Sequence, residues 1–406
     1  MATNISDSIQ ITQINASLSR GGWAAKLVSF NDTDILAVHQ KITIPWRSLF
    51  GGTSGILRTA FEGYVQPTRF QFDSASALTE YIAETSDGFL RKGWLQGLGL
   101  ADVSPGAREN YHQWDDNTGA GPPDPEVMTM GRIVRHILGF YDELGAPPPP
   151  PPPPAPPVGY TWPTNPAWLA HTNLVYHPTQ NPSGWVNIDN VETMPFDAVT
   201  DPNGTMKVTR YIVRETTNIW SRLQEIAKNE FFVVYCDKND NLYYTKHPMY
   251  KDVIPPVVMT FDKDFVVGPP VVDVRDENTI RQVRLHAVQD DGSTIHSNYP
   301  VVPTHVYGNI ADITYIRCND QPTLDDWAEK YYLFENRPYT VRWTAPGLSG
   351  LMFEILDRIE ITYAGTSANG VHINWAREKF WIHEINVIPG EGFGGTTEFI
   401  LEAENL

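Results

Sequence analysis

The sequence predicts a mainly β protein with flanking helices, in the α+β class. Aromatic residues, which favour strands, make up 12% of the chain. The 33 Pro and 30 Gly supply many turns, and several short segments alternate between apolar and polar residues. A charged fraction of 19% is too low for a disordered or coiled-coil protein. The 406 residues are enough for about two to four domains.

The N-terminal unit, residues 1–100, is expected to contain strands and one helix. Apolar residues alternate with polar ones around Ile9 and Ile11, around Ile42 and Ile44, and again over residues 61–65 and 69–72. A helix is then predicted with Ser76 as its N-cap and with one apolar face. That face consists of Leu78, Tyr81 and Ile82.

Residues 101–145 are predicted to form a helical segment. Asp124, Pro125 and Glu126 match the physics of a helix start, and an apolar stripe follows from Met130 to Tyr141. Proline fixes φ and lacks the N–H donor, so the run at residues 147–157 is expected to be extended polyproline II. We interpret this run as a stiff spacer rather than a docking site for a proline-binding module. Residues 146–205 as a whole are expected to be a Pro-rich linker and irregular insertion.

A helix–hairpin domain is expected over residues 206–261. Ile219, Leu223 and Ile226 lie on one helical face, which predicts a helix ending near Asn229. Residues 231–244 then consist of an apolar strand, a polar turn and an aromatic strand, which predicts a hairpin.

The C-terminal unit, residues 262–406, is expected to be a small antiparallel barrel or sandwich with one helix. The helix is predicted to open at Pro322 and to bury Trp327 and Tyr331. The order of strands and helix is the one expected for residues 1–100. We therefore hypothesise that the two units share a structure, although no residue-level repeat is visible. The remaining strands are predicted at residues 280–287, 340–343, 358–363, 379–387 and 399–403.

No motif typical of catalysis or cofactor binding is present. The chain lacks Gly-x-Ser-x-Gly, P-loop, EF-hand and zinc spacings. The glycine-rich residues 390–395 precede a predicted strand, so we interpret them as a hairpin loop rather than a nucleotide site. His286 and His296 can face each other across a turn, but we interpret them as surface histidines and not as metal ligands. We expect no catalytic, cofactor-binding or metal-ligating residues.

Paired acids and cysteines also have ordinary explanations. Asp115-Asp116 and Asp290-Asp291 are adjacent in sequence, so their side chains diverge and cannot flank a glycosidic bond. We interpret them as solvated turn residues. Cys236 and Cys318 are expected to be two buried free thiols rather than a disulfide.

The excess of acidic over basic residues limits the kinds of molecule that the protein can bind. With 30 Lys+Arg against 48 Asp+Glu, the net charge is −18, and this argues against a sequence-reading nucleic-acid binder. The first residues lack a basic start and an apolar core, so no secretory signal is expected. No apolar run approaches the roughly 20 residues of a membrane span. We expect synthesis and assembly in the cytoplasm.

Several weak motifs in a fixed order resemble tail hub (baseplate hub) proteins of tailed bacteriophages and related contractile injection systems. The helix at residues 218–227 and the hairpin at 231–244 resemble their helix–hairpin, with Pro248 following. The C-terminal order of an Asp-Gly turn, a helix with Trp327, residues 345–347 and a terminal strand is also similar. The resemblance covers about two thirds of the chain and excludes residues 147–205.

The resemblance implies an architecture and a set of partners. Such hubs carry two tube-protein-like β domains per chain, here residues 1–100 and 262–406, and form homotrimers with six such domains in a pseudo-sixfold ring. The implied partners are the tail tube or distal tail protein, the tape measure protein and the tail spike or fibre. DNA would pass through the lumen without specific binding, and the protein would be located in the virion, with no enzymatic activity and no cofactor.

Two other classes of function remain open from the sequence. One is a cell-wall or glycan hydrolase built from β domains. The other is a multidomain carbohydrate-binding protein that uses exposed residues among its 12 Trp, although most Trp are expected in cores and interfaces. The excess acids are expected either on the wall of a DNA channel or over the outside of the molecule.

Overall fold

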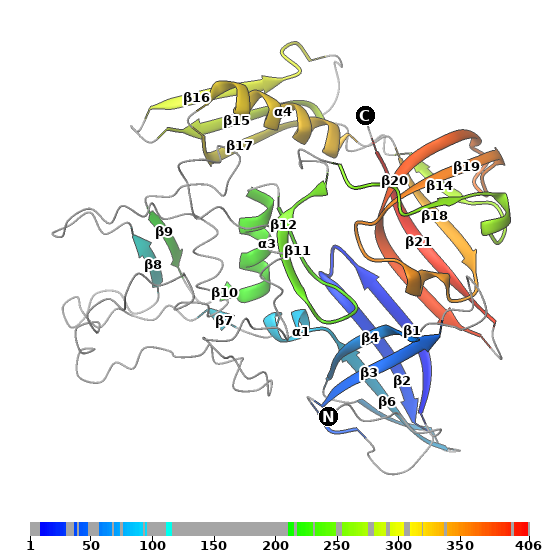
Figure 1. Cartoon of the computed structure of the whole chain (residues 1–406). Helices are drawn as coiled ribbons and strands as arrows, with labels where there is room; N and C mark the ends of the chain where they lie inside the picture. Colours follow the sequence, from blue (N-terminus) through cyan, green and yellow to red (C-terminus); the bar gives the residue numbers. More distant parts are fainter. Residues whose placement is uncertain are drawn as a thin grey trace, which may run out of the picture.

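Figure 1 shows a computed structural model of the chain, in which strands predominate. The mainly β class with flanking helices is confirmed. The structure describes the following residues: 9–29, 36–38, 40–47, 57–66, 69–73, 76–91, 94–95, 111–115, 210–214, 217–229, 232–248, 254–274, 280–289, 293–303, 309–318, 320–336, 339–390 and 394–404.

The first six strands form an antiparallel sheet in the order β1-β2-β6-β4-β3, with β5 also paired to β6. We call these strands the N-terminal β unit. Side chains alternate between the two faces of each strand, and those on the inward face are apolar and buried. Among them are Trp23, Leu27 and Phe61. The strands of this unit are β1 (Ile9–Ser17), β2 (Gly22–Ser29), β3 (Lys41–Arg47), β4 (Leu57–Val65), β5 (Arg69–Asp73) and β6 (Ser76–Glu84).

The helix predicted after Ser76 is wrong, because these residues form strand β6. Burial along β6 has a period of two: Tyr81 and Ala83 are fully buried, whereas Ile82 is 42% exposed. The spacing of Leu78, Tyr81 and Ile82 in the sequence also fits one face of a helix. Hydrogen-bonded pairing with β2, β4 and β5 stabilises the strand instead. A short helix, α1 (Asp87–Leu90), follows instead.

The C-terminal β unit consists of six strands around a second apolar face. The order is β14-β18-β21-β20, and the long strand β20 continues to β19, which pairs with β13. Trp343, Phe380 and Phe399 lie fully buried on its inward side. The strands are β13 (Met259–Phe261), β14 (Val271–Val274), β18 (Tyr339–Pro346), β19 (Arg358–Thr366), β20 (His372–Pro389) and β21 (Gly395–Ala403).

The two β units are joined edge to edge by antiparallel pairing of β1 with β20. Ile14 pairs with Val387 and Ala16 with Ile385, so the two units form one 12-stranded sheet. Figure 1 shows the blue N-terminal strands beside the red C-terminal strands. Buried side chains from both units form a single hydrophobic cluster. The N-terminal and C-terminal strands therefore share one core.

The middle of the chain supplies a helix and a hairpin. Helix α3 (Ile219–Asn229) buries Ile219, Leu223 and Ile226, as its apolar spacing predicts. Strands β11 (Phe232–Cys236) and β12 (Leu242–Lys246) form the predicted hairpin. Two short pairings complete this region, β7 (Trp94–Leu95) with β10 (Thr217–Asn218) and β8 (Tyr111–Asp115) with β9 (Arg210–Arg214).

Three further strands form a separate sheet, drawn at the top of Figure 1. Its order is β16-β15-β17, and helix α4 packs on one of its faces. The helix begins one residue before the predicted Pro322. The elements are β15 (Ile280–Val288), β16 (Thr294–Tyr299), β17 (Asn309–Arg317) and α4 (Gln321–Glu335).

Several sequence predictions lie outside the described residues. These are the helix after Asp124, the proline run at 147–157 and the irregular insertion up to residue 205. Within the described part of the chain, none of the helices has the length and apolarity needed to cross a membrane.

We predict that the edge-to-edge pairing depends on packing around Ile385. This side chain is fully buried, and its residue pairs with Ala16 on one side and Phe399 on the other. Replacing Ile385 by Ala should lower the free energy of unfolding by about 2–5 kcal/mol, measured by urea denaturation, because a cavity forms between the units. The matched control is Ile388→Ala on the same strand, where the side chain is 45% exposed and a change of about 0.5 kcal/mol or less is expected. Equal losses from both variants would contradict the prediction.

Candidate functional site: the junction between the two β units

The hairpin of β11 and β12 has a turn whose shape is fixed by one aspartate. Asp237 Oδ1 accepts the backbone N–H groups of Asn239 at 2.9 Å and Asn241 at 2.8 Å. Its Oδ2 accepts the Asn241 side-chain amide at 3.0 Å and the Tyr243 hydroxyl at 3.1 Å. Asp240 takes a positive φ of 64°, which short polar side chains tolerate. We call β11, β12 and residues 237–241 the junction hairpin.

One side of the junction hairpin bonds to the N-terminal β unit. The Cys236 N–H donates to Gly21 O at 2.8 Å, and the Glu62 N–H donates to Lys238 O at 2.8 Å. The Ser86 N–H donates to Asp240 Oδ1 at 2.6 Å, and Asp240 is fully buried. Backbone groups of β4 and of the turns after β1 and β6 thus hold the tip.

The other side of the tip bonds to the C-terminal β unit through a lysine. Lys238 Nζ donates to Leu351 O at 3.1 Å and Phe353 O at 3.3 Å, and it pairs with Glu354 Oε1 at 3.2 Å. Glu354 Oε2 also accepts the indole N–H of Trp23, a residue of β2, at 3.1 Å. Lys238 and Glu354 therefore connect the hairpin and both β units.

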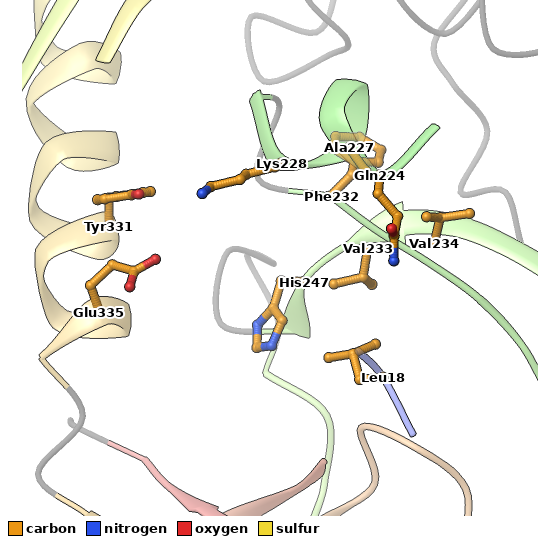
Figure 2. A pocket seen from close by; sticks show the side chains of 10 residues that line it. All are labelled: Leu18, Gln224, Ala227, Lys228, Phe232, Val233, Val234, His247, Tyr331 and Glu335. Carbon is orange, nitrogen blue, oxygen red and sulfur yellow. The ribbon is translucent and has the colours of Figure 1, made fainter. Parts of the chain in front are cut away.

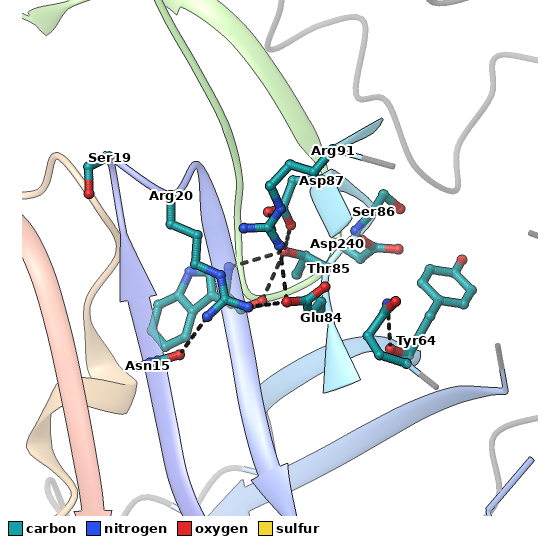
Figure 3. A network of polar contacts seen from close by, with 12 residues as sticks. Asn15, Ser19, Arg20, Tyr64, Glu84, Thr85, Ser86, Asp87, Arg91 and Asp240 are labelled. Carbon is teal, nitrogen blue, oxygen red and sulfur yellow. Dashed lines mark hydrogen bonds and ion pairs between the residues drawn. The ribbon is translucent and has the colours of Figure 1, made fainter. Parts of the chain in front are cut away.

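A second polar network lies beside the hairpin at the ends of β1, β2 and β6 (Figure 3). Arg20 and Arg91 both pair with Glu84, and Arg91 Nη2 also lies 3.1 Å from Asp87 Oδ2. Asp87 accepts the Thr85 hydroxyl and is fully buried. The network fixes the turn from β6 into α1, against which the hairpin tip rests.

Burial raises the pKa of several carboxyl groups at this junction, among them Asp87, Asp240 and Glu354. It brings the pKa of Asp87 to about 7 and that of Asp240 to about 8, because desolvation disfavours the charged form. Desolvation also raises the pKa of Glu354 to about 8, and Lys238 opposes this shift. The Glu354 side chain keeps 26% of its surface exposed, so solvent weakens the effect there.

The carboxyl groups with raised pKa values do not form an active site in the described structure. Such values are typical of catalytic acids, but Asp87 and Asp240 are 0% exposed, and Oδ1 of each accepts a hydrogen bond from the protein itself. A substrate cannot reach them. The arrangement instead positions one rigid hairpin against two sheets.

A cleft of about 250 Å³ lies between the α3–hairpin region and α4 (Figure 2). Its apolar wall comes from Leu18, Phe232 and Val233, and Lys228 faces Tyr331 and Glu335 of α4 across the opening. No pair of carboxylates flanks this cleft in the described residues. The full lining is Leu18, Gln224, Ala227, Lys228, Phe232, Val233, Val234, His247, Tyr331 and Glu335.

The structure places most residues that the sequence singled out. Cys236 and Cys318 are buried and free, as predicted. Gly390 and Gly394 close a hairpin loop between β20 and β21 through an N–H···O bond of 3.0 Å. Asp115 ends strand β8, and the other three paired acids lie outside the described residues.

His286 and His296 face each other, as predicted, and Nδ1 of one lies 2.7 Å from Nδ1 of the other. In the described part of the chain, no group of three or more His, Cys, Asp or Glu is placed to hold a metal ion. Sequence reasoning missed Lys238, Asp240 and Glu354, because the first two look like solvated turn residues and their partners are distant in sequence.

We predict that loss of the Lys238 amine loosens the junction. Replacing Lys238 by Met keeps the stem but removes bonds to two carbonyls and one carboxylate, so the free energy of unfolding should fall by about 1.5–3 kcal/mol in urea denaturation. Lys26→Met is the control, since Lys26 pairs with Glu80 at the surface with 44% of its side chain exposed. That change should cost less than about 1 kcal/mol. An indistinguishable effect of the two variants would contradict a junction role.

We predict that stability falls as the pH rises from about 4 to about 8. Asp240 and Asp87 have folded-state pKa values above the ordinary 3.8, so the folded chain keeps protons that the unfolded chain releases. Their contribution is complete below pH 3.8 and is lost as the pH rises through about 7 and about 8. Asp240→Asn keeps an acceptor for Ser86 and removes one titrating group. The slope between about pH 5 and about pH 7 should then become shallower by about 1.4 kcal/mol per pH unit. An unchanged slope, measured by thermal or urea unfolding across this range, would show that Asp240 is ionised in the fold.

Comparisons with known proteins agree with the fold. No protein-family model and no curated protein matches the sequence. The tail protein from Neisseria meningitidis MC58 is similar in structure, with a TM-score of 0.54, 10% identity, and coverage of 98% of this chain and 96% of that chain. The prophage MuSo2 43 kDa tail protein from Shewanella oneidensis has a TM-score of 0.47, 11% identity, and coverage of 97% of both chains.

A third solved structure is the prophage tail protein gp18 from Listeria monocytogenes EGD-e. It has a TM-score of 0.49 and 10% identity, and the match covers 98% of this chain and 90% of that chain. At these identities the likeness concerns the fold alone. The resemblance to phage tail proteins that the sequence predicts is confirmed at that level: this chain has the fold of the Neisseria tail protein.

Proposed function

We propose that this chain is a structural protein of a phage-like tail, and that it serves as the tail or baseplate hub. The observation that carries the proposal is the joining of two antiparallel β units of one chain into a single 12-stranded sheet through β1 and β20. The fold shared with a tail protein supports the same role. The two tube-like units would correspond to residues 1–100 and to the strands within 262–406.

In the proposed assembly, three chains place six β units in a ring. Each chain contributes one junction internally, through β1 and β20, and the other junctions form between chains. Such contacts are head to tail, and a ring closes only if their rotation completes a circle. A ring of this kind can meet a sixfold tail tube on one side and a threefold spike or fibre on the other.

The face of the sheet opposite the core suits a wall that DNA passes without binding. Three of the bases on the described strands pair with acids on neighbouring strands: Lys26 with Glu80, Lys41 with Glu62, and Arg342 with Glu398. Around β1 and β20 the face is polar and carries the Gln13–Asn386 bond of 2.7 Å and the Ser17–Glu384 bond of 2.9 Å. Unpaired rows of Lys and Arg would retain duplex DNA by releasing its counterions, and paired charges do not.

The other two classes of function find less support in the described residues. Trp23, Trp220, Trp343 and Trp381 are at most 3% exposed, so they build the core and do not form a platform for sugars. The buried Asp87 and Asp240 do not form a hydrolase site. A non-enzymatic role in the virion agrees with both observations.

The experiment that tests the proposal is the assembly state of the full chain. We predict a homotrimer by analytical ultracentrifugation, and a ring with a central channel and six β units by electron microscopy. A stable monomer at every concentration, or rings with only three β units around the channel, would overturn the hub assignment. Weak trimers should tighten when the tail-tube protein is added, because a sixfold partner selects the closed ring.

A further inference from the structure

Helix α4 packs on one face of the sheet of β15, β16 and β17. Val283, Leu285 and Ala287 of β15 are fully buried, as are Leu324 and Ala328 of α4. Side chains alternate along a strand, so His286 lies on the opposite face. Its cross-strand neighbour is His296 of β16. This face holds two histidines that the hub function does not use.

The two imidazole rings converge at ligand distance. Their centroids are 4.8 Å apart, and the two Nδ1 atoms are 2.7 Å apart. Two nitrogen ligands at ~2.0–2.1 Å from one metal ion, at a right angle, lie ~2.9 Å apart. The rings need to separate by ~0.2 Å to hold an ion at this angle, or by ~0.6–0.7 Å at the tetrahedral angle that Zn²⁺ prefers, where the two nitrogens lie ~3.3–3.4 Å apart.

A third residue fixes which nitrogen is free. His286 Nε2 lies 2.8 Å from Asp312 Oδ1 on β17, the parallel neighbour of β15. A carboxylate accepts but does not donate, so the Nε2 of His286 carries the proton, and in the neutral ring Nδ1 keeps its lone pair. A carboxylate behind a histidine orients that histidine toward a metal in the same way.

We propose that His286 and His296 bind a divalent transition-metal ion through their Nδ1 atoms, with Asp312 as the positioning residue for His286. Imidazole pairs suit Zn²⁺, Ni²⁺ and Cu²⁺ rather than Mg²⁺ or Ca²⁺. In the absence of the ion, Nδ1 of His296 donates the proton that lies between the two rings. When the ion binds, His296 carries this proton on Nε2 instead, so both histidines bind as neutral imidazoles and no net proton is released. Two protein ligands leave coordination positions for water or for a donor from another molecule. The site is therefore expected to be weaker than a closed structural zinc site.

The surroundings tolerate an ion. The nearest base along β15 is Arg284, and its Nε donates to Gln282 Oε1 at 3.0 Å rather than to the histidines. Asp312 supplies one negative charge at the site and is 54% exposed. The histidines are also reachable, since 34% of the His286 side chain is exposed.

The test is calorimetric titration of the full chain, without an affinity tag, with NiCl₂ and separately with ZnCl₂ near neutral pH. We expect one ion per chain, with saturation. His296→Gln and His286→Gln should each abolish saturable binding, and Asp312→Asn should weaken it by about 10-fold or more. His372→Gln is the matched control, because His372 is exposed on β20 and bonds to Gly365 O; it should bind as the wild type does.

A second measurement separates binding from folding. Ni²⁺ should raise the melting temperature of the wild type and of His372→Gln, but not of His286→Gln or His296→Gln, while all four melt alike without metal. Absence of saturable binding by the wild type, or equal binding by a chain that lacks both histidines, would overturn the site. Full affinity in Asp312→Asn would overturn the positioning role. None of these outcomes depends on whether the chain forms a trimer.

Discussion

The antiparallel pairing of β1 with β20 is the interaction on which the rest of the structure depends. An unpaired edge strand exposes a row of N–H and C=O groups, and a chain with two separate sheets would have such edges on both. When β1 pairs with β20, the backbone N–H and C=O groups at one edge of each unit bond to those of the other unit. This pairing also aligns Ile14 and Ala16 with Val387 and Ile385, so that two apolar faces become one core.

The junction hairpin follows from this pairing, because its tip needs both units in place. Asp240 accepts from the turn after β6, and Lys238 donates to carbonyls that precede β19. Buried polar and charged groups add little net stability, since the cost of desolvation offsets the bonds that they form. They do penalise any arrangement in which a partner is missing. The hairpin therefore fixes the relative position of the two units more than it strengthens their contact.

Local patterns in the sequence were sufficient for the local elements. The apolar spacing of Ile219, Leu223 and Ile226 predicted α3, and the turn beginning at Asp237 predicted the junction hairpin. The helix predicted after Ser76 was wrong because the position of Tyr81 fits both a helical and a strand periodicity. Only pairing with the neighbouring strands β2, β4 and β5 favours the strand.

Long-range contacts were beyond a single sequence. Gln13 and Asn386 are 373 positions apart, and Lys238 and Leu351 are 113 apart. A polar turn residue shows nothing of such a partner. The same limit applies to Asp312, because it pairs with His286 from the parallel strand β17, and the sequence pattern shows only the hairpin that joins the two histidines. The fold class and the type of most elements follow from periodicity, whereas the junction follows from tertiary contacts.

The hairpin also bears on how a pseudo-sixfold ring can be threefold. If six similar β units form the proposed ring, the contact within a chain and the contact between chains cannot be identical. Each chain has one junction hairpin, and its tip bonds to both units of its own chain. Every second junction would then carry a hairpin, and the junctions between would not. The strand pairing would provide the sixfold repeat that a tube needs, and the hairpins would mark the threefold repeat that a spike or fibre needs. One chain can thus present both symmetries, since one depends on the backbone of β1 and β20 and the other on Lys238 and Asp240.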